Sequence, residues 1–220
     1  MHQLGDRSQH ILEIGCGWGG FAERALHANS HRLTGITLSP AQHQYASQRL
    51  AEHTQVDIQL TDYRDVQGPY DAIVSIEMFE AVGETYWQTY FHKIKALLAR
   101  KGRAVIQTIT IDEAYFAEYR RSGDAIRSYI FPGGMLPSPE RFEQHARQAG
   151  LRLINCHRFG QDYARTLLSW LDRFDVQKSA VQAQSFDQSF IRLWRFYLAY
   201  CAGAFAAERT DVMQVTLCHA

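Results

Sequence analysis

The 220-residue chain is predicted to be an α/β protein with a doubly wound, mostly parallel sheet. Short apolar segments alternate with helix-like segments through the first half, which is the pattern of strand–helix–strand units. The first apolar segment leads directly into the glycine-rich stretch 15–20, and such a strand–turn–helix unit is typical of this fold. Residues 70–76 are almost continuously apolar, as expected for a strand that is buried on both faces of a parallel sheet.

Each element of the first half has its own signal. Strands are expected where β-prone apolar residues form short runs, and helices are expected between them. Ser39 is placed as a helix N-cap, with Pro40 at the first helical position. The expected strands are residues 10–15, 32–37, 56–60, 70–76 and 102–111, and the expected helices are residues 21–29, 40–53 and 85–98.

The second half changes in character, because aromatic-rich helices replace the regular alternation. Residues 129–139 contain glycine, proline and aromatic side chains and are expected to form a loop or lid. The other expected elements are helices at 112–121, 139–149, 162–177 and 184–206 and strands at 151–158 and 212–219. We therefore predict one domain, residues 1–220, in which cap or lid and substrate-side helices at about 112–145 and 162–206 are inserted over the active site.

Composition excludes several classes of function. Lys plus Arg and Asp plus Glu both number 23, so no basic surface for nucleic acid is expected. The four cysteines are scattered and the histidines lack ligand spacing, so no metal site is expected. Residues 1–9 lack the apolar core of a signal peptide, and no segment is apolar over the ~20 residues that span a bilayer. We expect a cytoplasmic protein, and its oligomeric state is left open.

The glycine-rich stretch predicts a cofactor site. Glycines allow a tight turn and let a ligand lie against bare main chain, and the following helix N-terminus offers N–H groups. The spacing GxGxGG differs from the dinucleotide pattern, and an acidic residue two positions earlier suits the ammonium group of S-adenosylmethionine (SAM). A generic strand–helix turn is the alternative. The candidate cofactor-binding residues here are Glu13, Gly15, Cys16, Gly17, Trp18, Gly19 and Gly20.

Two further segments are candidates for the same ligand. Thr37 and Gln42 follow the second strand, where related sites grip ribose hydroxyls. Both are neutral, which disfavours a routine NAD site, but both can hydrogen-bond a ribose. Asp62, Tyr63 and Arg64 follow the third strand, where an adenine edge would lie. An ordinary loop with surface charges is the alternative for these three residues.

Several long motifs then occur in a familiar order. They are ILEIGCGWGG, GITLSPAQ, DYRD, YDAIVSIEMFEAVG, YIFPGGMLPS, FGQDYARTL and the helix-like segment 196–205. In these motifs the chain resembles the cyclopropane-fatty-acyl-phospholipid synthase family, which includes the mycolic acid cyclopropane synthases. The resemblance covers nearly the whole chain and implies the Rossmann-like fold of SAM-dependent methyltransferases.

The resemblance also implies a reaction. A methyl group passes from SAM to a cis double bond of an unsaturated phospholipid acyl chain, a carbocation forms, and a bound bicarbonate removes a proton to close a cyclopropane. Glu80 and Tyr163 match the family's active-site glutamate and tyrosine, and the backbone at Ile76 and Ile109 matches positions that line the bicarbonate site. The protein would then act as a peripheral protein at the inner membrane surface.

The chemistry of these residues agrees with those roles, although each has a structural alternative. A carboxylate at Glu80 would stabilise a carbocation, or it could simply be an acid at a helix N-terminus. Tyr163 offers a hydroxyl and a ring face, or it could be a packed aromatic. A stripe at helical spacing could line an acyl tunnel or belong to the core, and Cys201 in it is expected to be a buried small residue. The stripe consists of Phe186, Phe190, Leu193, Tyr197 and Cys201.

Four departures from the family pattern affect proton removal more than methyl transfer. The family's bicarbonate-binding histidine falls at Gln107, which can hydrogen-bond an anion but cannot relay a proton. Ala81 stands where the family often has histidine, and Glu77 where a small residue is usual. The chain begins about a dozen residues before the glycine loop, without the family's N-terminal segment, so it is either truncated or a shorter relative.

These departures leave alternatives for the product and the function. A methylated alkene or a methyl-branched lipid could form in place of a cyclopropane. A methyltransferase for a small soluble acceptor is the second hypothesis, and a non-catalytic SAM-binding subunit is the third.

Overall fold

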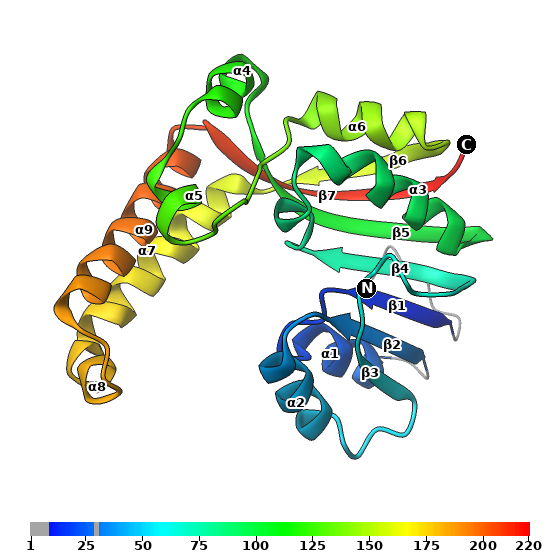
Figure 1. Cartoon of the computed structure of the whole chain (residues 1–220), viewed down its shortest axis with the longest axis horizontal. Helices are drawn as coiled ribbons and strands as arrows, with labels where there is room; N and C mark the ends of the chain where they lie inside the picture. Colours follow the sequence, from blue (N-terminus) through cyan, green and yellow to red (C-terminus); the bar gives the residue numbers. More distant parts are fainter. Residues whose placement is uncertain (1–8, 29–30) are drawn as a thin grey trace. The chain divides into compact units, whose positions relative to one another are not determined.

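The computed structural model describes residues 9–28 and 31–220, and strands run through both halves of the chain (Figure 1). The strands are β1 (His10–Ile14), β2 (Arg32–Thr37), β3 (Val56–Leu60), β4 (Tyr70–Ile76), β5 (Leu98–Ile111), β6 (Leu151–Arg158) and β7 (Thr210–His219).

The described residues form one seven-stranded sheet in the order β3-β2-β1-β4-β5-β7-β6. The pairs β1–β2, β1–β4, β2–β3 and β4–β5 are parallel. Parallel neighbours cannot be joined by a tight hairpin, so longer crossover connections separate them, most of them helical. The predicted α/β class with a doubly wound, mostly parallel sheet is therefore confirmed.

The chain divides into two compact units. The first contains the chain up to Thr108 together with Glu140–His157 and Gln214–Ala220, and the second contains Ile109–Pro139 and Arg158–Met213. Strands β5 and β7 have residues in both units. The organisation as one domain with an inserted cap stays a prediction.

The helices of the first unit follow its strands. They are α1 (Gly20–Ala28), α2 (Pro40–Arg49), α3 (Trp87–Leu97) and α6 (Pro139–Gln148), with the 3₁₀ turns η1 (Phe79–Ala81) and η2 (Glu84–Tyr86) before α3. The predicted N-cap of α2 is confirmed, because Ser39 Oγ accepts a hydrogen bond from Gln42 N at 3.3 Å.

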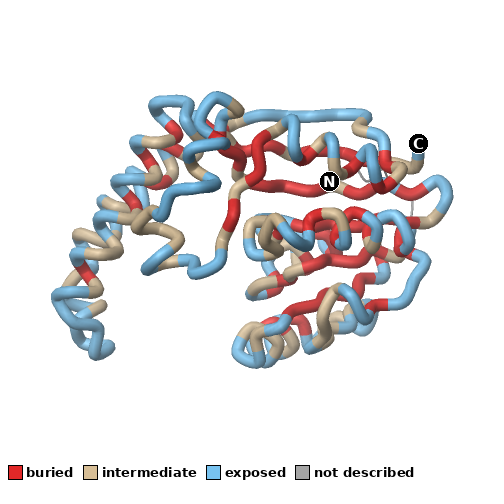
Figure 2. The backbone as a smooth tube through the Cα atoms, turned by 45° about the horizontal axis from the view of Figure 1, so that its top comes forward, coloured by how far each residue is buried: buried red, intermediate tan, exposed pale blue. Residues whose placement is uncertain are grey.

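The core of the first unit lies along β1, β2 and β4, whose residues are mostly buried, whereas β6 is largely exposed. Buried segments are red in Figure 2. One cluster joins α1 to the strands, and its central members are Ile11, Ala22, Ala25, Leu33 and Val74. A second cluster is aromatic and joins α3 to α6, with ring centroids of Phe79, Phe91 and Phe142 4.9 to 5.4 Å apart. Each fully buried Phe contributes about 1.5–3 kcal/mol by leaving water, so this cluster anchors the segment that follows β4.

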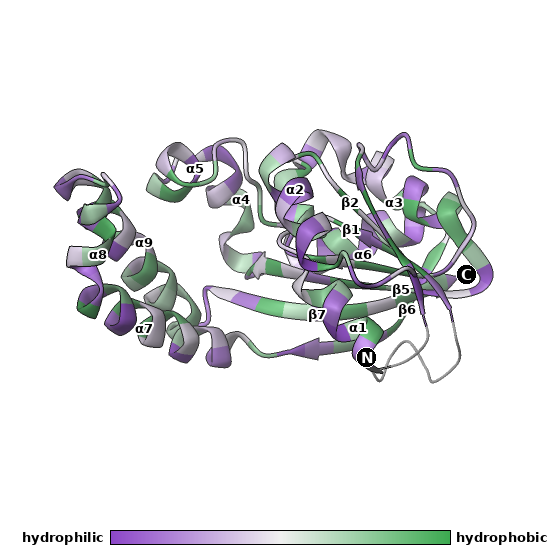
Figure 3. Ribbon diagram, turned by 90° about the horizontal axis from the view of Figure 1, so that it is seen from below, coloured by the Kyte–Doolittle hydropathy of each residue, from purple (hydrophilic) through white to green (hydrophobic). Residues whose placement is uncertain are grey.

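The second unit is built around a helical hairpin. Its helices are α4 (Glu113–Arg121), α5 (Ala125–Tyr129), α7 (Gly160–Val176), α8 (Lys178–Ala183) and α9 (Gln188–Ala206). Helices α7 and α9 each carry hydrophobic and hydrophilic residues (Figure 3). They pack through Ala164, Leu167, Leu198, Ala202 and Phe205. Within residues 9–28 and 31–220, no helix has both the length and the apolar character needed to cross a membrane.

A single arginine organises the segment between α4 and the predicted lid. Arg127 Nε donates to Asp124 Oδ2 at 2.9 Å, and its guanidinium lies 4.3 Å from the centroid of the Tyr119 ring. The hydroxyl of Tyr119 in turn accepts a hydrogen bond from Leu136 N at 3.2 Å. These contacts tie the glycine- and proline-rich loop after α5 back to α4.

Several predicted boundaries were wrong. The helix expected at 85–98 is preceded by η2 and ends at Leu97, because Leu98 already pairs with Tyr70 through a bulged register. Strand β5 therefore begins four positions before the predicted 102–111. The helix expected at 40–53 ends at Arg49.

The helix expected at 184–206 begins only at Gln188, because Ser185 has a left-handed backbone (φ +70°) and Asp187 caps the helix by accepting a hydrogen bond from Phe190 N at 2.7 Å. Helix α5 was not predicted, and it begins at its own cap, Asp124. Asn29, the predicted end of the first helix, lies outside the described residues, as do residues 1–8 of the polar N-terminal segment.

The junction of β7 and α7 predicts a steric test of the second unit. Gly160 N donates to Asp211 Oδ1 at 2.8 Å, and a Cβ at Gly160 would lie 2.6 Å from that oxygen and 3.0 Å from Asp211 Cα. We expect Gly160→Ala to lower the free energy of unfolding by about 1–3 kcal/mol. Gly203→Ala in α9 is the control, since its Cβ meets nothing within 4 Å, and it should be neutral or stabilise by up to about 1 kcal/mol. Urea unfolding measures both, and equal effects would contradict the account.

Candidate functional site

The carboxyl ends of β1 to β5 lie along one edge of the sheet. Each of these strands pairs in parallel with its neighbour, so the loops that follow them emerge on the same side. Open α/β sheets hold their ligands at this edge. Most of the predicted site residues lie in these loops or near these strand ends, and they are brought to a common edge.

The glycine loop after β1 has the conformation that only glycine adopts without strain. Gly15, Gly17 and Gly19 have φ values of +81°, +52° and +81°. A Cβ at Gly15 would meet Met78 Cγ at 2.9 Å, whereas a Cβ at Gly17 would meet nothing within 4 Å. Gly17 therefore presents main chain that a ligand can approach closely.

The turn into α1 carries an exposed aromatic pair. Trp18 is 53% exposed, and its ring meets the exposed Tyr45 ring edge-on at 5.4 Å. Gly19 lies close to α2, where an added Cβ would meet Leu50 Cδ1 at 3.2 Å, and Gly20 starts α1. The sequence prediction that this stretch forms a strand–turn–helix unit is confirmed.

Glu13 is the buried acid of this loop. It is 2% exposed, and its Oε2 atom has no hydrogen-bond partner in the part of the chain that the structure describes. Burial raises the pKa of this carboxyl from 4.5 to about 8. Burial also raises the pKa of the neighbouring Cys16 thiol to about 12, so Cys16 is a neutral packing residue. A buried carboxylate without a cation is costly, so this position would gain most from a positively charged ligand.

The predicted ribose contacts, Thr37 and Gln42, contact each other. Thr37 Oγ1 donates to Gln42 Oε1 at 2.8 Å and accepts from Ser39 N at 3.1 Å. These bonds fix the turn between β2 and α2. Because the Gln42 amide oxygen accepts from Thr37, the amide nitrogen is the end of the Gln42 side chain that can donate to a ligand. Their role as ribose ligands stays a prediction.

The loop after β3 is held by its own ion pair. Arg64 Nε and Nη2 lie 2.9 and 2.7 Å from the two carboxylate oxygens of Asp62, and this bidentate contact lowers the pKa of Asp62. The Tyr63 ring contacts the ring of the buried Tyr90, with centroids 5.6 Å apart. These contacts hold the loop together, and the contact of its three predicted residues with an adenine stays a prediction.

Glu80 lies in η1, directly after β4. Its Oε1 accepts a hydrogen bond from the buried Thr108 Oγ1 on β5 at 3.0 Å. Helix α3 begins only at Trp87, so Glu80 is not an acid at the N-terminus of that helix. A partly buried carboxylate, oriented by a hydroxyl at the carboxyl edge, can stabilise a positive charge on a ligand.

A second carboxylate, Glu77, belongs to a chain of side-chain hydrogen bonds. Gln107 Nε2 donates to Glu77 Oε1 at 2.7 Å, and Gln107 Oε1 accepts from Gln214 Nε2 at 2.8 Å. Two of the departures from the family pattern, Glu77 and Gln107, are thus bonded to each other. Gln107 lies within the predicted site, but its recorded partners are side chains of this protein.

Ile76, Ile109 and Tyr163 are found in different units. Ile76 pairs with Gln107 in the β4–β5 ladder of the first unit. Ile109 and Tyr163 pack on the core cluster of the second unit, where the Tyr163 ring lies 5.6 Å from Phe159 and 5.4 Å from Phe205. This packing agrees with the structural alternative for Tyr163, and its role in a site with Glu80 stays a prediction.

The predicted aromatic stripe on the last long helix needs correction. Phe186 precedes α9, because Asp187 is the cap of that helix. Phe186, Phe190 and Trp194 stack in series, with successive ring centroids 4.4 and 5.6 Å apart. Tyr197 extends the series at 5.2 Å with a tilted ring, so the aromatic series includes Trp194 in place of Leu193. Tyr197 and Cys201 pack against the core cluster of α7 and α9, and Cys201 is partly buried where a buried residue was expected.

Sequence reasoning missed Thr108 and Gln214. Thr108 orients Glu80 and Gln214 orients Gln107, from positions 28 and 107 residues away. A polar residue next to Gln107 on a buried strand was an available signal for Thr108. Nothing in the local sequence marks Gln214.

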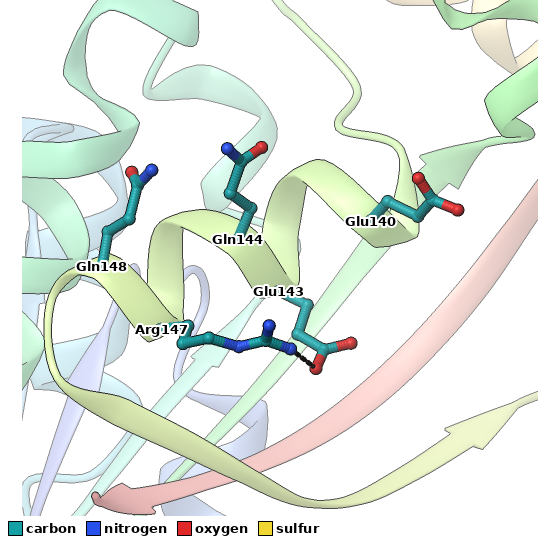
Figure 4. Close-up of a pocket in the computed structure, with 5 residues that line it drawn as sticks. All are labelled: Glu140, Glu143, Gln144, Arg147 and Gln148. Atoms are coloured by element: carbon teal, nitrogen blue, oxygen red, sulfur yellow. Dashed lines mark hydrogen bonds and ion pairs between the residues drawn. The ribbon is translucent and has the colours of Figure 1, made fainter.

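The hollow drawn in Figure 4 lies elsewhere. Its lining residues all come from α6, where Arg147 Nη2 pairs with Glu143 Oε1 at 2.6 Å. It is the exposed face of one helix and carries no feature of a binding site. In the described ranges, no cluster of His, Cys, Asp or Glu side chains could hold a metal ion.

Comparisons with known proteins identify the family of the chain. The family model described as mycolic acid cyclopropane synthetase matches residues 3–215. The chain is 39% identical over 96% of its length to the tuberculostearic acid methyltransferase UfaA1 of Mycobacterium tuberculosis (strain ATCC 25618 / H37Rv) and 35% identical over 93% to the cyclopropane-fatty-acyl-phospholipid synthase of Escherichia coli (strain K12). It covers 50% and 52% of these proteins, so the chain spans about half the length of the curated relatives it matches.

Among solved structures, the chain is similar to the mycolic acid cyclopropane synthase CmaA1 complexed with S-adenosylhomocysteine (SAH) and CTAB, with a TM-score of 0.89. The sequence identity is 28%, and the match covers 98% of this chain and 80% of CmaA1.

The buried carboxyl of Glu13 predicts a pH dependence of stability. Its pKa is about 8 in the folded protein and near 4.5 when unfolded, so the folded state binds the proton more tightly. The free energy of unfolding should therefore fall as pH rises from about 4.5 to about 8. Glu13→Gln, which cannot ionise, should flatten this slope, while Glu52→Gln on the surface should keep it. Urea unfolding across this pH range is the measurement, and an unchanged slope in Glu13→Gln would rule out the buried acid as its source.

Proposed function

Because the chain belongs to the mycolic acid cyclopropane synthetase family, we propose that it transfers a methyl group from SAM to the double bond of an unsaturated lipid acyl chain. The observation that carries this proposal is the buried Glu13 carboxyl beside open glycine main chain, at the same sheet edge as Glu80.

The residues present fit SAM. The Glu13 Oε2 atom has no partner in the described chain, and the ammonium group of a methionine moiety would supply the missing cation. The bare backbone at Gly17 allows close approach, and Thr37 and Gln42 offer neutral hydrogen bonds to a ribose. We assign the Asp62–Arg64 loop to the adenine end. When bound, SAM supplies an electrophilic methyl group.

Glu80 is proposed to stabilise the positive charge that develops on the acyl chain. Its carboxylate is held by Thr108, so it does not need to reorganise as charge appears. Tyr163 is proposed to assist through its hydroxyl and ring face, as the family resemblance implies. The substrate would be an unsaturated phospholipid, and contact with the membrane would be peripheral.

A direct test is the transfer of labelled methyl from SAM into vesicles of unsaturated phospholipid. Glu80→Gln keeps an oxygen for the Thr108 bond but removes the charge, so we expect label in the lipid to fall about a hundredfold or more. The surface variant Glu52→Gln should label as well as wild type. Wild-type protein that binds SAM but labels no lipid would overturn the lipid proposal and favour a small soluble acceptor or a non-catalytic role.

The product itself makes a second prediction. A cyclopropane and a methylated alkene have the same mass, but only the alkene takes up hydrogen under mild reduction. We expect every labelled product to be one of these two, because the cation is discharged by losing a proton. Mass spectrometry before and after hydrogenation separates them, and a labelled saturated branch without added reductant would contradict this discharge.

A further inference from the structure

Three side chains at the carboxyl edge form an ordered network. Gln214 Nε2 donates to Gln107 Oε1 at 2.8 Å, and Gln107 Nε2 donates to Glu77 Oε1 at 2.7 Å. The first bond fixes which end of the Gln107 amide faces Gln214. The Gln107 amide must therefore present its N–H group to Glu77, and one carboxylate oxygen is held in a defined place.

The backbone at Glu77 is also unusual. Its φ of +52° is in the left-handed region, which a residue with a long side chain adopts at a cost of about 1–3 kcal/mol. The Glu77 N–H donates to the carbonyl of Gln107 at 2.9 Å, so main chain and side chain are both held by the same β5 residue. A glycine at this position would avoid the strain, whereas this chain has a carboxylate there.

Of Glu77, Gln107 and Gln214, only Glu77 carries an acidic side chain. Amides such as Gln107 and Gln214 do not titrate, whereas a carboxylate does. Thr108, the next residue on β5, holds Glu80. Gln107 and Thr108 are consecutive residues of β5, so both carboxylates are held where the β4–β5 pair ends.

We propose that Glu77 is the general base that removes the proton ending the reaction; this inference rests on the proposed function. The Glu77 carboxylate takes a proton from a carbon next to the cationic carbon. The electrons of that C–H bond close the cyclopropane or form a C=C bond, and Glu77 passes its proton to water. Glu80 stabilises the cation, and Gln107 and Gln214 are positioning residues for Glu77.

This assignment changes the expectation for bicarbonate. Gln107 stands where the resemblance implies a bicarbonate-binding histidine. Its side-chain amide donates to Glu77 and accepts from Gln214. The chain supplies its own carboxylate at that place. Methyl transfer by this protein is then independent of bicarbonate.

The test is chemical rescue in the vesicle assay, with bicarbonate-free and bicarbonate-supplemented buffers. Glu77→Gly suits the left-handed backbone, so the variant should fold, and its thermal unfolding and SAH binding are measured first. We expect its product yield to fall about a hundredfold, within the range for loss of a general base, and to recover severalfold with added formate or bicarbonate. Glu80→Gln should not be rescued.

A second readout is the fate of the cation. In Glu77→Gln, which keeps the side-chain shape but cannot take the proton, we expect some cation to be captured by water as a methyl-branched alcohol, seen by its mass. Wild-type rates in both Glu77 variants, or wild-type activity that requires bicarbonate, would overturn the inference while leaving the proposed function intact. Wild type that labels no lipid would overturn both.

Discussion

The parallel alignment of β4 and β5 is the constraint on which the rest of the site depends. Ile76 pairs with Gln107, so the two strands end side by side. In the loop after β4, Glu77 and Glu80 therefore accept hydrogen bonds from Gln107 and Thr108, which are consecutive residues of β5. A register slip of one residue would exchange the faces of those side chains and separate both carboxylates from their partners. The aromatic cluster of α3 and α6 fixes this segment through the buried Phe79.

The site is a set of carboxyl groups in different environments. Glu13 is buried without a cation, and its raised pKa keeps it largely protonated in the ligand-free protein at neutral pH. Glu80 is oriented by a hydroxyl, and Glu77 by an amide. Environment thus separates three acids of similar intrinsic chemistry into a cation binder, a charge stabiliser and a base in the account proposed above.

Much of the fold could be predicted from the sequence, because periodicity and capping are local. The strands at 32–37, 56–60, 70–76 and 151–158 and the Ser39 cap were located correctly. Boundaries failed where pairing or backbone conformation decided them, as at Leu98 and Ser185. The glycine loop lies between β1 and α1, and Glu80 lies just after β4, as motif and position predicted. The bonds from Thr108 and Gln214 depend on which strands become neighbours, so no local pattern contained them.

The central claim is that an ammonium-bearing ligand binds beside Glu13 at the carboxyl edge of the sheet. The most direct test is calorimetry of SAH binding in buffers of different ionisation enthalpy, which measures the number of protons released on binding. An ammonium group would return Glu13 to its charged form, so near pH 7 binding should release about one proton. Glu13→Gln should release about none and bind more weakly. Binding without proton release by the wild type, or equal release by the variant, would contradict the claim.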